Sequence, residues 1–245
     1  MKIKNYQSLL FLLLIFVIAC KKEPKTRVVE FKSTTYQSLG TYNTLGLPDF
    51  LLPPDTISAD LHSFIRSTLV DGVDLRTTHP DLLTSKAIAD IPITQPSDVF
   101  ITFVSQGGGY ANTFAFYTYP TSQPPTTTDD IKLITYVFPN SGNFTPLKGG
   151  DKVKLGRFDA GTSVGFVLLQ DSWDTIGHTL HNKVVHFCSN DVLNPEVDPN
   201  LKKHAVLVMY PPENKVLIGF EDMDRTNENC DNDFDDLVLY ATVRQ

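Results

Sequence analysis

Acidic side chains crowd a short stretch near the C-terminal end of the sequence. Residues 221–236, EDMDRTNENCDNDFDD, carry eight carboxylates and a single basic residue, Arg225. Two like charges 4 Å apart repel by about 4 kcal/mol at an effective dielectric constant of about 20, so this density is unfavourable unless a cation neutralises it. Ca²⁺ takes about six to eight oxygen ligands in a flexible geometry, which a loop of carboxylates can supply. The stretch therefore predicts a calcium site.

The expected ligands flank two apolar runs that read as strands. They are Glu221, Asp222, Asp231, Asp233, Asp235 and Asp236, with Asn232 in reserve. The pattern is not an EF-hand, because the glycine at the sixth loop position and the flanking helices are missing. Zn²⁺ prefers histidine or thiolate, and Mg²⁺ binds through few carboxylates and retains water. The alternative is a solvated acidic turn that keeps an edge strand soluble. Phe234, in the middle of the acids, is expected to enter the core and turn its neighbours outward.

Two other patterns point to different chemistry. GTSVG at residues 161–165 matches the G-x-S-x-G nucleophile elbow, but a turn precedes it and a β-rich run follows, so Ser163 is not expected to act as a nucleophile. Trp173 with Tyr110, Tyr117 and Tyr119 could form an aromatic platform for a sugar ring, although core packing is the commoner fate of such residues.

The elements that must position the acids are short strands. Runs rich in β-branched and aromatic residues alternate with Gly, Pro and Asn turns, and they predict strands at 99–105, 112–119, 131–138, 151–158, 163–170, 204–210, 215–220 and 234–243. Eight short strands without intervening helices indicate an all-β fold, an antiparallel jelly-roll-like β-sandwich over residues 97–245.

One short helix is expected before the sandwich. Ser58 is a suitable N-cap, Leu61, Ile65 and Leu69 share a helical face, and the Asp71–Gly72 pair ends the pattern. Prolines interrupt the sequence from there to residue 96. Residues 42–96 are therefore predicted to form a helix and an irregular extension that packs onto the sandwich.

The sequence begins with a targeting segment. Two lysines precede an apolar run that is too short to span a bilayer, as in a secretory signal. Residues 17–20, VIAC, resemble the lipobox of bacterial lipoproteins, which predicts cleavage after residue 19 and lipidation of Cys20. Acyl chains contribute about 0.8 kcal/mol per buried methylene and would anchor the protein to a membrane. Residues 20–41 then read as a flexible tether. The expected location is the bacterial cell envelope, at the outer membrane, with either the periplasm or the exterior as the facing side.

The net charge bears on which partners the chain can bind, and the cysteines bear on whether it forms a disulfide. The formal net charge of −7 disfavours nucleic acid. With Cys20 lipidated, Cys188 and Cys230 remain in a compartment that permits disulfides. A bridge between them would contribute roughly 4 kcal/mol on the chain-entropy model, and two unpaired thiols are the alternative.

The acidic stretch also carries a family resemblance. GFEDMDRTNENCDNDFDDLVLY resembles the signature of the bacterial domain of unknown function 4114, found with or within LruC-type lipoproteins. SDVFITFVSQGGGYANTFAFYTY, the FPN and LNPE segments and GDKVKLGRFDAGTSVGFVLL follow in the expected order, so the resemblance covers about residues 98–243. Asp235 departs from the asparagine that is usual in the family. The resemblance implies an exported β-sandwich with calcium binding and no established catalysis.

Together these features predict a membrane-anchored lipoprotein whose calcium-binding sandwich acts as a binding or adhesion module for a glycan or protein ligand. Two alternatives stay open. A glycan hydrolase would need two carboxyl groups facing each other across a cleft, whereas the acids here are clustered in one region of the sequence. A purely structural envelope component is the other.

Overall fold

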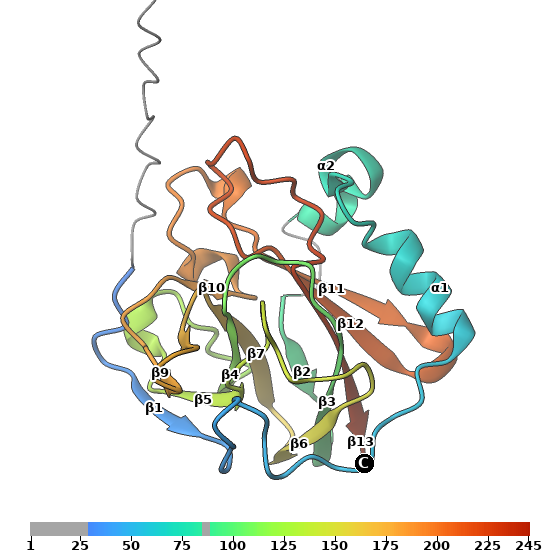
Figure 1. The fold of residues 1–245 in the computed structure, drawn as a ribbon, viewed down its shortest axis with the longest axis vertical. Coiled ribbons are helices and arrows are strands. Elements are labelled where there is room, and N and C mark those ends of the chain that lie inside the picture. Colours follow the sequence, from blue (N-terminus) through green and yellow to red (C-terminus); the bar gives the residue numbers. More distant parts are fainter. Residues whose placement is uncertain (1–28, 85–88) are drawn as a thin grey trace, which may run out of the picture.

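Two β-sheets pack face to face in the computed structural model, which describes residues 29–84 and 89–245 (Figure 1). The targeting segment, Cys20 and the first part of the expected tether lie outside these residues. Among the described residues, no helix has the length and apolar character needed to cross a membrane. The predicted all-β sandwich is confirmed.

The six-stranded sheet has the order β1-β5-β4-β7-β10, with β2 pairing to the first half of β7. Its strands are β1 (Thr35–Ser38), β2 (Ile91–Ile93), β4 (Thr113–Pro120), β5 (Leu133–Phe138), β7 (Thr162–Leu169) and β10 (His186–Cys188). The five-stranded sheet has the order β11-β12-β13-β3-β6. Its strands are β3 (Ser97–Ser105), β6 (Lys152–Phe158), β11 (Ala205–Tyr210), β12 (Lys215–Phe220) and β13 (Leu237–Arg244). A separate hairpin consists of β8 (Trp173–Asp174) and β9 (Thr179–Leu180).

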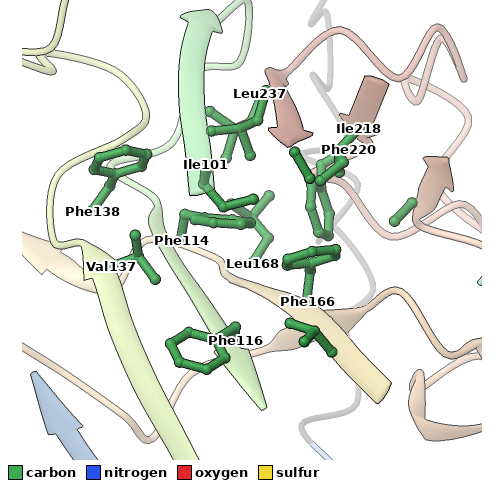
Figure 2. Packing of buried hydrophobic residues seen from close by; sticks show 14 of the residues in the cluster. Ile101, Phe114, Phe116, Val137, Phe138, Phe166, Leu168, Ile218, Phe220 and Leu237 are labelled. Atoms are coloured by element: carbon green, nitrogen blue, oxygen red, sulfur yellow. The ribbon is translucent and has the colours of Figure 1, made fainter. Parts of the chain in front are cut away.

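The main core lies between the two sheets and is rich in phenylalanine (Figure 2). Phe114 of β4 stacks on Phe166 of β7 with 5.8 Å between ring centroids, and it meets the edge of Phe220 of β12 at 6.1 Å. Burial of each such side chain contributes about 1.5 to 3 kcal/mol. Alternate residues of the same strands point outward, which is why Ala115 and Tyr117 belong to a different cluster.

All eight predicted strands are present with small shifts at their ends. β13 shows the largest shift, because it begins at Leu237 and the acids before it form a loop. The sequence did not predict β1, β2, β8, β9 and β10. β1 lies within the expected tether, and it pairs with β5 in parallel, so the sandwich is not wholly antiparallel.

The predicted helix is confirmed as α1 (Ala59–Thr68), with Ser58 accepting a hydrogen bond from the amide of Leu61. A single turn, α2 (Leu75–Thr78), and a 3₁₀ turn, η1 (Pro80–Leu83), follow it. Further 3₁₀ turns are η2 (Thr128–Asp130), η3 (Asp191–Leu193), η4 (Pro199–Leu201) and η5 (Pro211–Glu213). The buried face of α1 packs on the outer face of the five-stranded sheet, against Leu217 and Tyr240. In Figure 1 the helix runs along this sheet, and α2 lies near the acidic loop that connects β12 to β13.

Candidate metal centre

The pairing of two neighbouring strands brings the two halves of the acidic stretch together. β12 ends at Phe220, which is in register with Leu237 at the start of β13. Glu221 and Asp222 therefore leave β12 beside Asp236, and the amide of Asp222 donates a 2.7 Å hydrogen bond to Oδ2 of Asp236. The intervening residues form a loop that returns Asp231 and Asp233 to the same place.

All six predicted ligands take part in carboxylate groups that could hold a metal ion. Within each group one oxygen of every member lies within 4.8 Å of the others. The groups are Glu221 with Asp222 and Asp236, Glu221 with Asp231 and Asp233, and Asp71 with Asp233 and Asp235. Glu221 and Asp233 are each shared by two groups, so the acids form one continuous cluster.

Glu221 is the most informative member of the cluster. Its side chain is 1% exposed, and its Oε2 atom is buried without a hydrogen-bond partner. A buried polar atom without a partner costs about 1 to 3 kcal/mol, and more when the group is charged. A cation among the carboxylates would supply the missing interaction.

Burial and mutual repulsion both disfavour the charged forms of these acids. Burial, helped by the nearby charge of Asp236, raises the pKa of Glu221 to about 9. Burial is also the main cause that raises the pKa of Asp236 to about 8, of Asp235 to about 7 and of Asp222 to about 6. Hydrogen bonds within the protein, such as that from Asn112 to Asp222, compensate these charges only in part. At neutral pH the cluster retains protons unless a cation displaces them.

The basic residue of the stretch does not neutralise the acids. Arg225 is buried, and its Nε donates a 2.7 Å hydrogen bond to Oδ1 of Asn232 while Nη1 donates to the carbonyl of Lys203. Among the described parts of the chain, no ion pair involves any of the six predicted ligands. The side-chain oxygen of the reserve ligand Asn232 thus already accepts a hydrogen bond from Arg225.

Phe234 enters the core as expected, but it does not turn both neighbours outward, because Asp233 is buried and Asp235 is half-buried. Its side chain is fully buried in the cluster beneath α1, and the guanidinium of Arg225 lies 5.4 Å from its ring centre. Asn232 and Phe234 both have positive φ, 59° and 61°. Non-glycine residues rarely adopt this conformation, which marks a tightly turned loop backbone on both sides of Asp233.

A glycine turn forms one wall of the cluster. The amides of Gly107 and Gly108, which follow β3, both point to the carbonyl of Asp236 at 3.3 Å. A Cβ atom on Gly108 would lie 2.3 Å from Oδ2 of Asp222, and one on Gly107 would lie 2.6 Å from Oδ1 of Asp235. The sequence predicts only a turn for this run, whereas the structure uses it to admit the carboxylates.

Asp71 is a site residue that the sequence does not reveal. In the sequence, the Asp71–Gly72 pair indicates only the end of a helix. In the structure, the carboxylate of Asp71 lies close to those of Asp233 and Asp235. The adjacent Gly72 amide donates a 2.7 Å hydrogen bond to Oδ2 of Asp233. The segment after α1 is thereby fixed against the acidic loop, and Asp71 adds an exposed carboxylate beside the buried Asp233.

The cluster is held from behind by a buried histidine. Nδ1 of His204 lies 3.1 Å from the carbonyl oxygen of Glu221, and its Nε2 lies 2.8 Å from Oε1 of Glu196. The His204 ring stacks on Phe187 of β10 at 3.9 Å. These contacts fix the backbone at Glu221, so its carboxylate projects from a rigid support.

The two cysteines near the site are not bridged. Cys188 lies on β10 in the cluster on the outer face of the six-stranded sheet, and Cys230 lies in the acidic loop. Both are buried free thiols, and burial raises the pKa of each. The disulfide considered from the sequence is therefore absent, because the two residues belong to different packing environments.

Ser163 and the aromatic residues considered in the sequence analysis are held by contacts within the fold. Ser163 lies inside β7, and its hydroxyl forms a 2.8 Å hydrogen bond with Thr121. The aromatic residues considered as a platform for a sugar ring do not face one another as a group. Tyr117 and Tyr119 stack on each other, and Tyr119 donates to Asp90, while Trp173 meets the ring of Tyr42 edge-on at 5.9 Å.

The comparisons with known proteins give one match. The model of the family described as a domain of unknown function (DUF4114) matches residues 158–244. This segment contains all six predicted ligands, whereas Asp71 and the glycine turn lie outside it. Residues 98–157, where the resemblance was also expected, are not matched. No curated protein and no solved structure matches the chain significantly.

Proposed function

We propose that this chain is a calcium-binding β-sandwich that serves as a binding or adhesion module. Calcium is held by Glu221, Asp222, Asp231, Asp233, Asp235 and Asp236, with Asp71 as an additional ligand. The observation that carries the proposal is the buried Oε2 atom of Glu221, which lacks a partner in the middle of the carboxylate cluster.

Three further features support a cation in this place. The raised pKa values show that the surroundings disfavour the ionised forms of these carboxylates when no cation is bound. Arg225, the basic residue of the stretch, is hydrogen-bonded elsewhere. Phe234 and the glycine turn place the acids within a few ångströms of one another despite their repulsion. The number of oxygens and their irregular arrangement favour Ca²⁺ over Mg²⁺, which requires a near-octahedral shell and keeps several waters.

We also propose that the module is presented at the bacterial cell envelope as a lipoprotein. The support is the sequence itself, in which a signal-like apolar run ends in VIAC at residues 17–20. Anchoring by lipid at Cys20 leaves the sandwich free to act as a soluble domain. Its partner would be a glycan or a protein of the envelope or its surroundings.

The proposal is tested by thermal unfolding of the protein in chelator, in magnesium and in calcium. For a site with a dissociation constant of about 10⁻⁴ to 10⁻³ M, calcium near 1 mM stabilises the fold by roughly 0.4 to 1.4 kcal/mol. That corresponds to a rise of roughly 1 to 5 °C in melting temperature for a domain of this size. Magnesium should produce a smaller rise.

Two isosteric variants make the test specific. Glu221→Gln should abolish the calcium-dependent rise, and it should change the melting temperature in chelator little, because Glu221 already holds a proton there. Asp224→Asn is the control, since Asp224 belongs to the same stretch but to no carboxylate group, and an asparagine keeps the acceptor used by Thr226. A calcium response that is missing in the natural chain, or equal in the two variants, contradicts the proposal.

A further inference from the structure

A hollow of about 370 Å³ lies next to the acidic cluster and is not part of it. Its lining includes Gly109, Phe144, Asp171, Trp173, Asp174 and His181. Gly109 directly follows the two glycines that contact the acids, and a Cβ atom there would meet nothing within 4 Å. One turn thus forms a wall of both sites, with Gly108 facing the carboxylates and Gly109 bordering the open space.

Two aromatic side chains, those of Phe144 and Trp173, line this hollow, and Phe144 is held in an unusual backbone conformation. Phe144 is 76% exposed and has a φ of 66°, a strained conformation for an aromatic residue. The side chain of Asn140 donates to the carbonyls of both Phe144 and Leu45, so these two exposed apolar residues lie on adjacent backbone. The nearly buried ring of Trp173 also lines the hollow. Strained backbone that holds an apolar side chain in water is a feature of ligand sites.

Two of the polar side chains of the hollow, Asp171 and Asp174, are carboxylates that accept hydrogen bonds, and Thr175 and His181 can also donate. Oδ1 of Asp174 accepts from the amides of Ile176 and Gly177, which fixes the carboxylate, and Oδ2 lies 3.7 Å from Nε2 of His181. Oδ1 of Asp171 accepts from the amide of Ala111. The lining contains no lysine or arginine. The hollow therefore suits a ligand that donates hydrogen bonds and carries no negative charge.

A single buried side chain connects the hollow to the acidic cluster. Nδ2 of Asn112 donates a 2.6 Å hydrogen bond to Oδ2 of Asp222, and its Oδ1 accepts from the amide of Asp171. Asn112 is fully buried, and Nε2 of the neighbouring Gln170 donates to the carbonyl of Asp222. The backbone at Asp171 is thereby linked to Asp222.

We propose that this hollow binds a pyranose ring of a neutral or amino-substituted glycan. The exposed face of Phe144 packs on the C–H face of the sugar, and the carboxylates of Asp171 and Asp174 accept hydrogen bonds from its hydroxyl or amino groups. Anionic sugars are repelled by the same carboxylates. The inference deepens the proposed function and rests on it, because calcium at Asp222 fixes the hollow through Asn112.

The chain contains one tryptophan, Trp173, so its intrinsic fluorescence reports directly on the hollow. The full chain is titrated in calcium with cellotriose, maltotriose, mannotriose, chitotriose and the chitosan trimer. At least one should give a saturable change in emission. Phe144→Ala and Asp174→Asn should each weaken that binding tenfold or more, and chelator should weaken it as well. Leu133→Ala is the control, because Leu133 is an exposed apolar residue of β5 outside the lining.

Absence of a response to all five trisaccharides, or equal effects of Phe144→Ala and Leu133→Ala, overturns the inference. A response to a lysine-rich peptide without any to the sugars overturns it in favour of a protein ligand. If the calcium-dependent rise in melting temperature persists while sugars fail to bind, only the hollow is misassigned. If sugars bind equally with and without calcium and no melting rise occurs, the calcium proposal fails while the sugar site stands.

Discussion

Gly108 occupies a position between carboxylates where any side chain would collide with them. A Cβ atom at this position would lie 2.3 Å from Oδ2 of Asp222 and 3.1 Å from Oδ1 of Asp236. Asp222 is buried and hydrogen-bonded to Asn112, so it cannot move away freely. Gly109, its neighbour, faces open space. The two glycines therefore form a matched pair for testing whether the glycine turn supports the metal centre.

We expect Gly108→Ala to lower both stability and calcium affinity. Overpacking of a filled site costs about 1 to 3 kcal/mol, and displacement of the Asp222 carboxylate removes a ligand from the cluster. Gly109→Ala should leave both properties close to those of the natural chain. Urea unfolding in chelator and calorimetric titration with calcium measure the two effects, and equal behaviour of the two variants would mean that the turn does not support the site.

At this scale the sequence is a good guide to the acids and a poor guide to their neighbours. Local charge density is visible in a sequence, and all six predicted carboxylates meet in space. Asp71 could not be found in this way, because it lies in the turn after α1 and reaches the cluster only through the tertiary fold. Asn232 looks like a ligand because amide oxygens can bind calcium, but its contact with Arg225 is set by the loop conformation.

Among the elements, strands that carry a strong alternating pattern were predictable, and short strands were not. β12 was predicted with its observed bounds, Lys215–Phe220. β1, β2 and β10 have three or four residues each, too few to show a period, and they form because a longer strand offers them an edge. α1 was predictable because its cap and its buried face are both encoded locally.

The cap of α1 gives a prediction at this scale. Ser58 accepts from the amide of Leu61 and donates to the carboxylate of Glu213, so it joins the helix to the turn between β11 and β12. Ser58→Ala should destabilise the protein by about 1 kcal/mol, or about 2 to 4 °C in melting temperature. Ser63→Ala, on the exposed face of the same helix, should be neutral or slightly stabilising because alanine is the better helix former. A melting temperature that is unchanged by Ser58→Ala would show that the helix does not depend on this cap.

At the scale of the whole molecule, the sequence predicted a β-sandwich. It did not predict how all the strands pair within the two sheets. Repeated short strands without helices between them indicated a sandwich. The parallel docking of β1 on β5 joins residues that are distant in the chain, such as Thr35 and Leu133, and nothing in the local pattern of residues 35–38 specifies it. The N-terminal segment is held there by Phe31 and Tyr36, which both contact His186 of β10.

This docking should make stability depend on pH. Burial lowers the pKa of His186 to about 4 from its ordinary value of 6.5. The unfolded chain therefore takes up a proton near pH 6.5 while the folded chain stays neutral, so the contribution of His186 is present above the unfolded pKa and is lost as the pH falls towards the folded one. The loss amounts to roughly 3 kcal/mol at most.

The contribution of His186 to the free energy of unfolding is measured by urea unfolding of the natural chain and of His186→Gln at about pH 7, 5.5 and 4. Glutamine does not titrate, so the difference in unfolding free energy between the two proteins should shrink as the pH falls. A difference that stays constant over this range would mean that His186 is not buried as a neutral residue.

The acidic cluster joins segments that are far apart in the chain, since Asp71 follows α1, Gly108 follows β3 and the other acids flank the loop before β13. A calcium ion held there as proposed would act as a reversible cross-link between the segments whose carboxylates it contacts. Opening of such a segment would then require the ion to leave first, so calcium would lower the unfolding rate by the same factor by which it stabilises the folded state. Resistance to protease digestion would then rise with the calcium concentration, and the chain would become short-lived where calcium is scarce.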